Sequence, residues 1–273
     1  MKFKIGFVSN IYEKKNADHI ESAPTADRGA PRKSVVQVMF PGRGYSLAYY
    51  NDQFDLRIGD YVYVDGKLEG QRGRVTDVSY AFKIKVSDYK RVVAVVDTAV
   101  KGQFLFAGSH LVTFDREVIP VSKISTWFNA PAKEGDEYIC GKDDQIFRLD
   151  DPKGMKVSPE IAERGYDYYM ENNVAYIAID GNRGYAIVEG SKPYEVEFDY
   201  DSGEIGNLTC SCYCSYHCKH EVAAMLQLKE TLNTIENHYA EQYEHTGYFA
   251  AILKETLFSF AVNGQERGIL TLS

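Results

Sequence analysis

The run Cys210-Ser211-Cys212-Tyr213-Cys214-Ser215-Tyr216-His217-Cys218-Lys219-His220 places four thiols and two imidazoles within eleven residues. Ordinary core packing gives no reason for so dense a cluster. Cysteines separated by one residue make strained disulfides, and a secreted disulfide framework would spread its cysteines through the fold. The run therefore predicts metal binding or thiol redox chemistry in a reducing compartment. The fifth cysteine, Cys140, stands alone and is interpreted as a small buried hydrophobe.

The spacing within this run favours a closed zinc site. A Cys-x-Cys pair, Cys210 and Cys212, and a Cys-x-His pair, Cys218 and His220, stand at its two ends. A tight turn can present the first pair, and the start of a helix can present the second. Zinc prefers four sulfur or nitrogen ligands in a tetrahedron, and three thiolates with one imidazole leave no position for water. We therefore expect one structural Zn²⁺ ion rather than a catalytic one.

The sequence around the run shows helical and β-type patterns in turn. A helical segment precedes three β-type runs, and two further helices follow the cysteines. Ser158 and Pro159 fit the cap and the first turn of the leading helix. The predicted elements are a helix at 157–172, strands at 174–180, 183–190 and 194–200, and helices at 220–243 and roughly 248–261.

Several stretches in this region resemble the SWIM-type zinc finger. They are GSKPYEV at 190–196, SGEI at 202–205, CSC at 210–212 and CKHEVAA at 218–224. The resemblance covers about residues 155–230. Carried over position by position, it implies a ligand set of Cys210, Cys212, Cys218 and His220. It also implies a role in nucleic-acid binding or protein contact, with a helicase-like ATPase as a protein partner.

The spacer between the two ligand pairs departs from the SWIM pattern, because it holds two more potential ligands. Cys214 and His217 leave open an alternative set made of Cys212, Cys214, Cys218 and His220. They also leave open a thiol and zinc redox sensor, in which oxidation of the thiols would release the metal.

The chain has 273 residues, which corresponds to about two domains. No stretch approaches about 18 apolar residues, and the charged start lacks the apolar core of a signal peptide, so we expect a cytoplasmic protein without a membrane partner. The net charge of −8 is unevenly spread, because residues 1–125 carry +5 and residues 126–273 carry −13. An acidic total therefore does not exclude a nucleic-acid partner for the first part.

The first part of the chain reads as a series of short β-type runs broken by Gly, Asp and Asn. They lie at 35–40, 45–50, 61–64, 73–80, 81–86 and 92–96. Short strands at this spacing predict a β-barrel-like domain over 1–125. The pattern from Ile58 to Val75, with its glycine-rich tip, resembles the hairpin of SH3-like or KOW-type barrels. A linker at 126–154 and a zinc-finger domain at 155–273, with its core at about 174–230, complete the predicted division.

Basic residues in the first part are the candidates for nucleic-acid contact. Between Arg32 and Arg91 there are 11 basic and seven acidic residues. Cations beside aromatic rings can grip phosphates and stack bases, although Lys83 and Lys85 equally fit the solvent face of a half-buried strand. The candidate contacts are Lys67, Arg72, Arg74, Lys83, Lys85, Lys90 and Arg91.

The motifs together favour a binding protein over an enzyme. The sequence contains no Walker phosphate loop, no G-x-S-x-G and no H-E-x-x-H. We therefore expect an α+β, non-enzymatic, zinc-binding adaptor that binds nucleic acid or acts in a complex that processes it. The alternative is a protein–protein module with a structural zinc, whose acidic C-terminal half docks a basic partner.

Overall fold

The computed structural model describes residues 29–133, 135, 141, 145–212, 214, 216–261 and 270–272, which excludes Cys140. Within these residues, the strands are β1 (Ser34–Met39), β2 (Ser46–Asn51), β3 (Tyr61–Val64), β4 (Arg72–Ser79), β5 (Val92–Val95), β6 (Val100–Gly102), β7 (Leu105–Ala107), β8 (His110–Thr113), β9 (Phe147–Arg148), β10 (Val174–Asp180), β11 (Arg183–Val188), β12 (Tyr194–Asp201), β13 (Glu204–Cys210), β14 (Tyr248–Leu253) and β15 (Leu270–Leu272). The α-helices are α1 (Val121–Phe128), α2 (Pro159–Met170), α3 (Lys219–His238), α4 (Ala240–Thr246) and α5 (Lys254–Ala261). Short 3₁₀ turns lie at Gly66–Leu68, Val86–Asp88 and Pro152–Met155.

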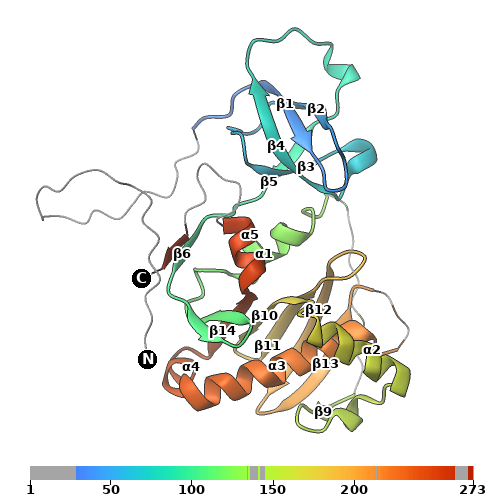
Figure 1. Cartoon of the computed structure of the whole chain (residues 1–273), viewed down its shortest axis with the longest axis vertical. Helices are drawn as coiled ribbons and strands as arrows, with labels where there is room; N and C mark the ends of the chain where they lie inside the picture. Colours follow the sequence, from blue (N-terminus) through green and yellow to red (C-terminus); the bar gives the residue numbers. More distant parts are fainter. Residues whose placement is uncertain are drawn as a thin grey trace, which may run out of the picture.

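Two antiparallel sheets carry most of the described strands. The smaller has the strand order β2-β1-β4-β3-β5, and the larger has the order β7-β8-β14-β10-β11-β12-β13-β9. β6 pairs separately with β15, in parallel. Figure 1 shows the smaller sheet at one end of the molecule and the larger sheet at the other. Helices and antiparallel sheets in one chain confirm the predicted α+β class.

The smaller sheet contains the predicted glycine-tipped hairpin. β3 and β4 form it, and Tyr61 pairs with Arg74. At its tip Gly66 has a φ of 87°, a backbone conformation that glycine reaches without steric cost. A single bridge between Tyr50 and Arg91 links the two edges of the sheet, but the described strands do not close into a barrel.

The segment at 81–86, predicted as a strand, is instead a loop. β4 ends at Ser79, which pairs with Val35 near the start of β1. The chain beyond Ser79 therefore has no neighbouring strand that could pair with its backbone groups. Lys83 and Lys85 are exposed on this loop, so they do not alternate on the face of a sheet.

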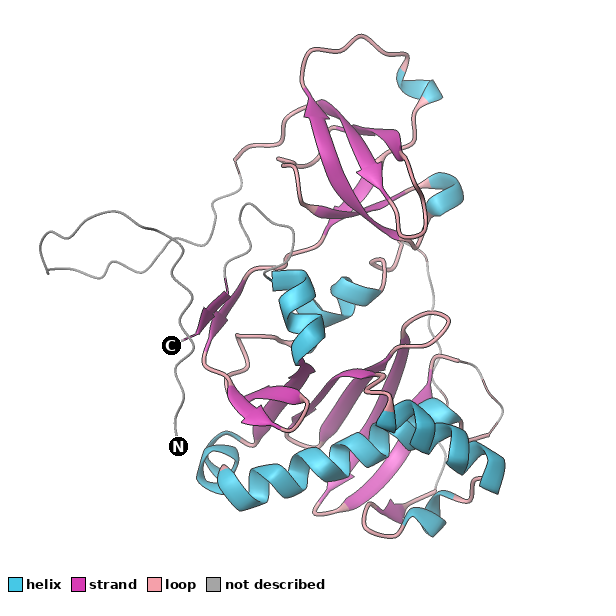
Figure 2. Ribbon diagram, viewed as in Figure 1, coloured by secondary structure: helices cyan, strands magenta, loops and turns pink. Residues whose placement is uncertain are grey.

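Both faces of the larger sheet are covered. α3 lies along one face (Figure 2), where Leu228 shares a core with Ile177. α1 and α5 cover the other face, where Tyr176 shares a core with Tyr63 of the smaller sheet. Side chains of β10 contribute to both of these cores. Residues 174–179 are therefore all buried, and they form one continuous apolar run in the sequence. No helix in the described part of the chain is long and apolar enough to cross a membrane.

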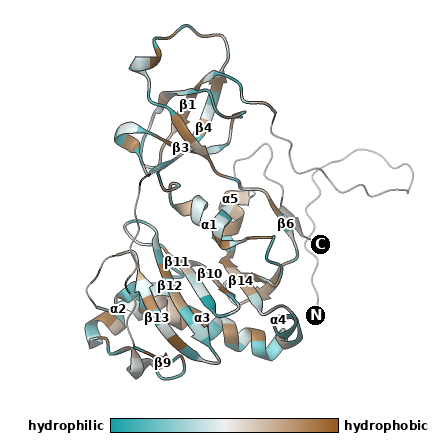
Figure 3. Cartoon of the chain, turned by 180° about the vertical axis from the view of Figure 1, so that it is seen from behind, coloured by the Kyte–Doolittle hydropathy of each residue, from teal (hydrophilic) through white to brown (hydrophobic). Residues whose placement is uncertain are grey.

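The predicted helix at 248–261 is wrong in its first half. β14 occupies Tyr248–Leu253 and lies between β8 and β10, and only Lys254–Ala261 is helical. A strand buried on both faces is apolar at every position, and periodicity alone cannot distinguish such a short run from a helix. Figure 3 shows the apolar colour on β14 and a hydrophilic α4 at the rim.

Along the chain, β5 is the last strand of the smaller sheet and β7 is the first strand of the larger sheet. β7 and β8 belong to the larger sheet, to which β8 is joined through β14. Trp127, near the start of the predicted linker, stacks on Phe260 with the ring centroids 4.6 Å apart. Tyr63 also donates a hydrogen bond to the carbonyl of Thr126. The chain around Trp127 is therefore a packed junction between the two sheets.

The close approach of α2 to α3 gives a stability prediction. An alanine Cβ at Gly165 of α2 would lie 2.4 Å from Cβ of Val222 on α3. Alanine gains about 1 kcal/mol in helix propensity, but overpacking costs roughly 1–3 kcal/mol. We expect Gly165→Ala to lower the free energy of unfolding by about 1 kcal/mol in urea denaturation, whereas Glu163→Ala on the exposed face leaves it nearly unchanged. A more stable Gly165→Ala protein would contradict this packing.

Candidate metal centre

Four donor side chains meet where β13 ends and α3 begins. Cys210 is the last residue of β13, and Cys212 lies in the turn that follows it. Cys218 is the N-cap of α3, and His220 lies in the first turn of that helix. The β12–β13 hairpin therefore presents the first pair of donors to the helix that presents the second pair.

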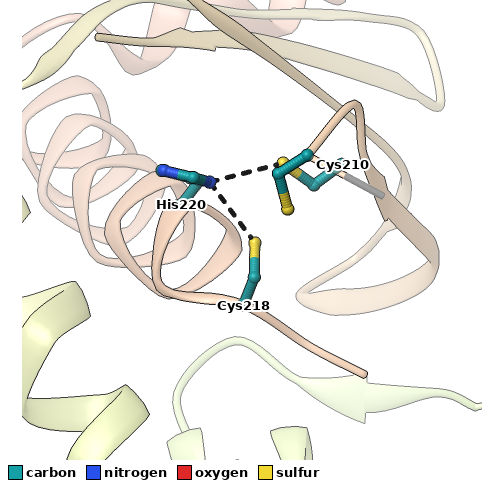
Figure 4. A group of neighbouring side chains, drawn as sticks. Cys210, Cys218 and His220 are labelled. Atoms are coloured by element: carbon teal, nitrogen blue, oxygen red, sulfur yellow. Dashed lines mark hydrogen bonds between the residues drawn. The ribbon is translucent and has the colours of Figure 1, made fainter. Parts of the chain in front are cut away.

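The donor atoms are close enough to hold one metal ion. The ligand atoms of Cys210, Cys212, Cys218 and His220 all lie within 4.8 Å of one another. Nδ1 of His220 is 3.7 Å from Sγ of Cys210 and 3.7 Å from Sγ of Cys218 (Figure 4). Zinc–sulfur and zinc–nitrogen bonds in a tetrahedron would place sulfur about 3.6 Å from nitrogen. These two sulfur–nitrogen distances therefore match those of a tetrahedral site.

The three thiols of the cluster compete for negative charge. The hydrogen bond shared with Cys218, together with burial, raises the pKa of Cys210. Burial also raises the pKa of Cys212. The hydrogen bond from Cys210 lowers the pKa of Cys218. A bound dication removes this competition, because it deprotonates every thiol that coordinates it.

Two tyrosines hold the imidazole ring of His220. Tyr194, the first residue of β12, stacks on the ring at 4.0 Å between centroids. Tyr168 of α2 meets the ring edge-on at 5.5 Å, and its hydroxyl accepts a hydrogen bond of 2.6 Å from Lys219. His220 thus lies on α3, but the orientation of its ring depends on Tyr194 of β12 and Tyr168 of α2. The role of Tyr168 had no signal in the sequence, because α2 is far from the cluster along the chain.

Cys214 and His217, the two alternative ligands, lie outside the group of four. Cys214 is exposed to solvent. His217 instead shares a hydrogen bond of 2.9 Å with the carboxylate of Glu221, and its ring meets Phe147 of β9 edge-on. The donors that the described structure gathers are those implied by the resemblance to the SWIM-type finger.

Arg72, predicted as a nucleic-acid contact, is instead part of the junction between the two sheets. Its guanidinium lies 4.2 Å from the ring centroid of Phe260 and 5.4 Å from that of Tyr61. Burial lowers the pKa of Arg72. Arg72 is half-buried, and its guanidinium faces two aromatic rings of the junction. This contact could not be predicted from the sequence, because Phe260 lies near the other end of the chain.

The other predicted cations lie on the surface of the smaller sheet or its loops. Exposed residues among them are Lys67, Arg74, Lys83, Lys85 and Lys90. Two cations have acidic partners, because Arg91 pairs with Asp52 at 2.6 Å and Lys85 approaches Asp88 at 3.9 Å. These pairs reduce the free positive charge of the surface.

One cation–aromatic pair on this surface was missed from the sequence. The guanidinium of Arg32 stacks over the ring of Tyr80 at 3.8 Å. Tyr80 is exposed and begins the loop that carries Lys83 and Lys85. Nearby, the rings of Tyr50 and Phe82 meet edge-on, and Arg91 lies over Tyr50. Cations therefore contact aromatic rings both at Tyr80, where the loop after β4 begins, and at Tyr50 of β2.

Comparison with known proteins adds a partial relative. The chain is 35% identical over 82 residues to an uncharacterized protein of Methanocaldococcus jannaschii. The match covers 30% of this chain and 34% of that protein, so the chain spans about a third of its relative's length. No family model matches the sequence, and no solved structure matches it.

Serine substitutions separate the four ligands from the spacer thiol. We expect Cys218→Ser to lose tight metal binding, because it removes one of the four donors. Cys214→Ser is the matched control, since it removes an exposed thiol of the same run and should bind metal like the parent protein. Cobalt titration, followed through thiolate-to-cobalt absorption, measures both. Equal loss of binding in the two variants would contradict the assigned ligand set.

Proposed function

We propose that this cluster holds one structural zinc ion and that the chain is a non-enzymatic adaptor that binds nucleic acid. The observation that carries the zinc assignment is the donor set of three thiol sulfurs and one imidazole nitrogen within 4.8 Å. Sulfur and imidazole ligands favour zinc, whereas magnesium and calcium prefer oxygen. Four protein ligands complete a tetrahedron and leave no open position for a substrate, which supports a non-catalytic role.

The bound ion would link the larger sheet to the helix that covers it. Cys210 and Cys212 follow β13, while Cys218 and His220 begin α3. α3 contributes a row of apolar residues to the core on that face of the sheet. A metal that joins the strand end to the helix start adds its binding free energy to the stability of the fold.

The proposal extends to a SWIM-type finger. The resemblance implies a β-hairpin before the ligands and an apolar helix after them, and β12–β13 and α3 occupy these places. It also includes the tyrosine of GSKPYEV, which is Tyr194, and this ring stacks on the ligand His220. Both features support the family assignment. Thiolate ligands of this kind also fit a cytoplasmic protein, because a reducing compartment preserves them.

The smaller sheet supplies the proposed nucleic-acid surface. Lys83 and Lys90 are exposed there, and Tyr80 presents an aromatic face beside Arg32. Cations bind phosphates without regard to sequence, and exposed rings stack on bases. The surface is separate from the zinc cluster, whose role in this proposal is to stabilise the larger sheet.

A second candidate function is protein contact through α2. Tyr166 and Met170 lie one turn apart on this helix and are 52% and 57% exposed. Acidic side chains share the exposed surface of the segment, at Glu160, Glu163, Asp167 and Glu171. An acidic surface with apolar side chains suits a basic protein partner. The resemblance to SWIM-type proteins suggests a helicase-like ATPase for this role.

The metal assignment predicts one zinc ion in each molecule of purified, untagged protein. A high-affinity chelator should remove the ion and lower the melting temperature, because metal binding and folding are linked. Atomic-emission spectroscopy and a thermal melt measure the two quantities. The Cys214→Ser protein serves as the control that keeps its zinc. Protein that folds equally well without any zinc would contradict the structural role.

The nucleic-acid assignment predicts binding that weakens with salt. We expect the double charge reversal Lys83→Glu with Lys90→Glu to lower affinity for single-stranded DNA at least tenfold at low salt. Each lost phosphate contact should reduce the slope of log affinity against log salt by about 1. Gel-shift titrations at several salt concentrations measure both effects.

The matched control for this experiment is Arg164→Glu with Arg183→Glu. It makes the same change in net charge on exposed residues of α2 and β11. We expect it to leave the affinity nearly unchanged. Absence of DNA binding by the parent protein, or equal loss in both variants, would contradict the assigned surface.

A further inference from the structure

Glu221 is a buried carboxylate beside the metal cluster that supplies no metal ligand. The residue is 4% exposed, and it lies in the first turn of α3, next to the proposed ligand His220. Carboxylates are almost never fully buried unless they have partners. Oε2 of Glu221 accepts a hydrogen bond of 2.9 Å from the backbone N–H of Cys218, and it lies 2.9 Å from Nδ1 of His217. A single carboxylate oxygen of Glu221 therefore contacts both His217 and Cys218.

The contact with Cys218 fixes the start of the helix. Cys218 is the N-cap, and Glu221 stands three residues later, so its carboxylate closes one half of a capping box. The first backbone N–H groups of a helix have no partners within the helix, and a free helix end frays. The ligands Cys218 and His220 both lie in this first turn. Their positions therefore depend on the turn that Glu221 closes.

The contact with His217 fixes the end of the spacer. The His217 side chain is mostly buried, and its ring packs edge-on against Phe147 of β9 with centroids 6.4 Å apart. The preceding residue, Tyr216, is 88% exposed, and Cys214 is exposed as well. The spacer thus passes from solvent into a packed environment at His217, immediately before the ligand Cys218.

We propose that the His217–Glu221 pair is a positioning clamp for the metal centre. It holds Cys218 and His220 in ligating geometry and slows the release of the bound ion. His217 therefore contacts Glu221 rather than the metal. This contact explains why a histidine that is not a ligand lies in the run. Partners of metal ligands commonly change affinity by 10- to 100-fold when they are removed. This inference rests on the zinc site proposed above.

Zinc release into a chromophoric chelator tests the clamp directly. We expect Glu221→Ala to release zinc 10- to 100-fold faster than the parent protein. Glu221→Gln keeps an oxygen that can accept both hydrogen bonds, so its release rate should stay within a few-fold of the parent. Glu236→Ala removes an exposed carboxylate from the same helix and is the matched control, with a parental rate expected. Equal rates for Glu221→Ala and Glu236→Ala would overturn the clamp.

A double-mutant cycle tests whether the two residues act together. His217→Ala should also speed release about tenfold, and adding Glu221→Ala should bring less than the product of the two single effects. Fully multiplicative effects would overturn a shared clamp. His217→Ala alone remains decisive if Glu221→Ala does not fold, because a parental release rate in it would overturn the proposal.

Cobalt absorption distinguishes the clamp from loss of a ligand. At saturating cobalt, His217→Ala should retain the parental spectrum of a three-sulfur, one-nitrogen site, because all four ligands remain. A changed spectrum would make His217 a ligand and overturn its positioning role. Parent protein that binds neither zinc nor cobalt would instead refute the proposed metal site itself, so the two failures are distinguishable.

Discussion

Three sulfurs and one imidazole nitrogen meet at the junction of β13 and α3, where the β12–β13 hairpin joins the helix that covers the larger sheet. These atoms lie within 4.8 Å of one another, and a bound cation would allow all three thiols to ionise in so small a volume. The junction fixes where α3 starts, and α3 then covers one face of the sheet from Val222 to Ile235. Tyr194 and Tyr168 orient the imidazole from β12 and α2. The hairpin, both helices and the donor set are therefore one physical unit.

The sequence predicted this unit well, because its signals are local. The strand at 174–180 matches β10, and the helix capped by Ser158 matches α2, since strand patterning and capping depend on neighbouring residues. The ligand pairs stand out by spacing alone. The larger sheet as a whole could not be predicted, because β7, β8 and β14 join it across long sequence separations. No local pattern encodes which strands that are distant in the sequence become neighbours in the sheet.

The same reasoning explains where the prediction was wrong. The strand expected at 81–86 has the correct alternation but no partner beyond Ser79 of β4. The helix expected from Tyr248 has apolar residues at helical positions, but its first half is a central strand in which residues 248–252 are all buried. Arg72 was predicted to be a surface cation, but its guanidinium packs over the ring of Phe260, which lies far along the chain. In each case tertiary pairing overrode a local signal.

The proposed function places the positive charge and the metal in different parts of the chain, with exposed lysines on the smaller sheet and a zinc ion that would stabilise the larger sheet. Its central claim is the closed zinc site. X-ray absorption at the zinc edge, on the purified parent protein and on Cys214→Ser, tests that claim most directly. We expect both spectra to show three sulfurs at about 2.3 Å and one nitrogen at about 2.0 Å. A site with oxygen or water ligands, or a loss of one sulfur in Cys214→Ser, would contradict the account.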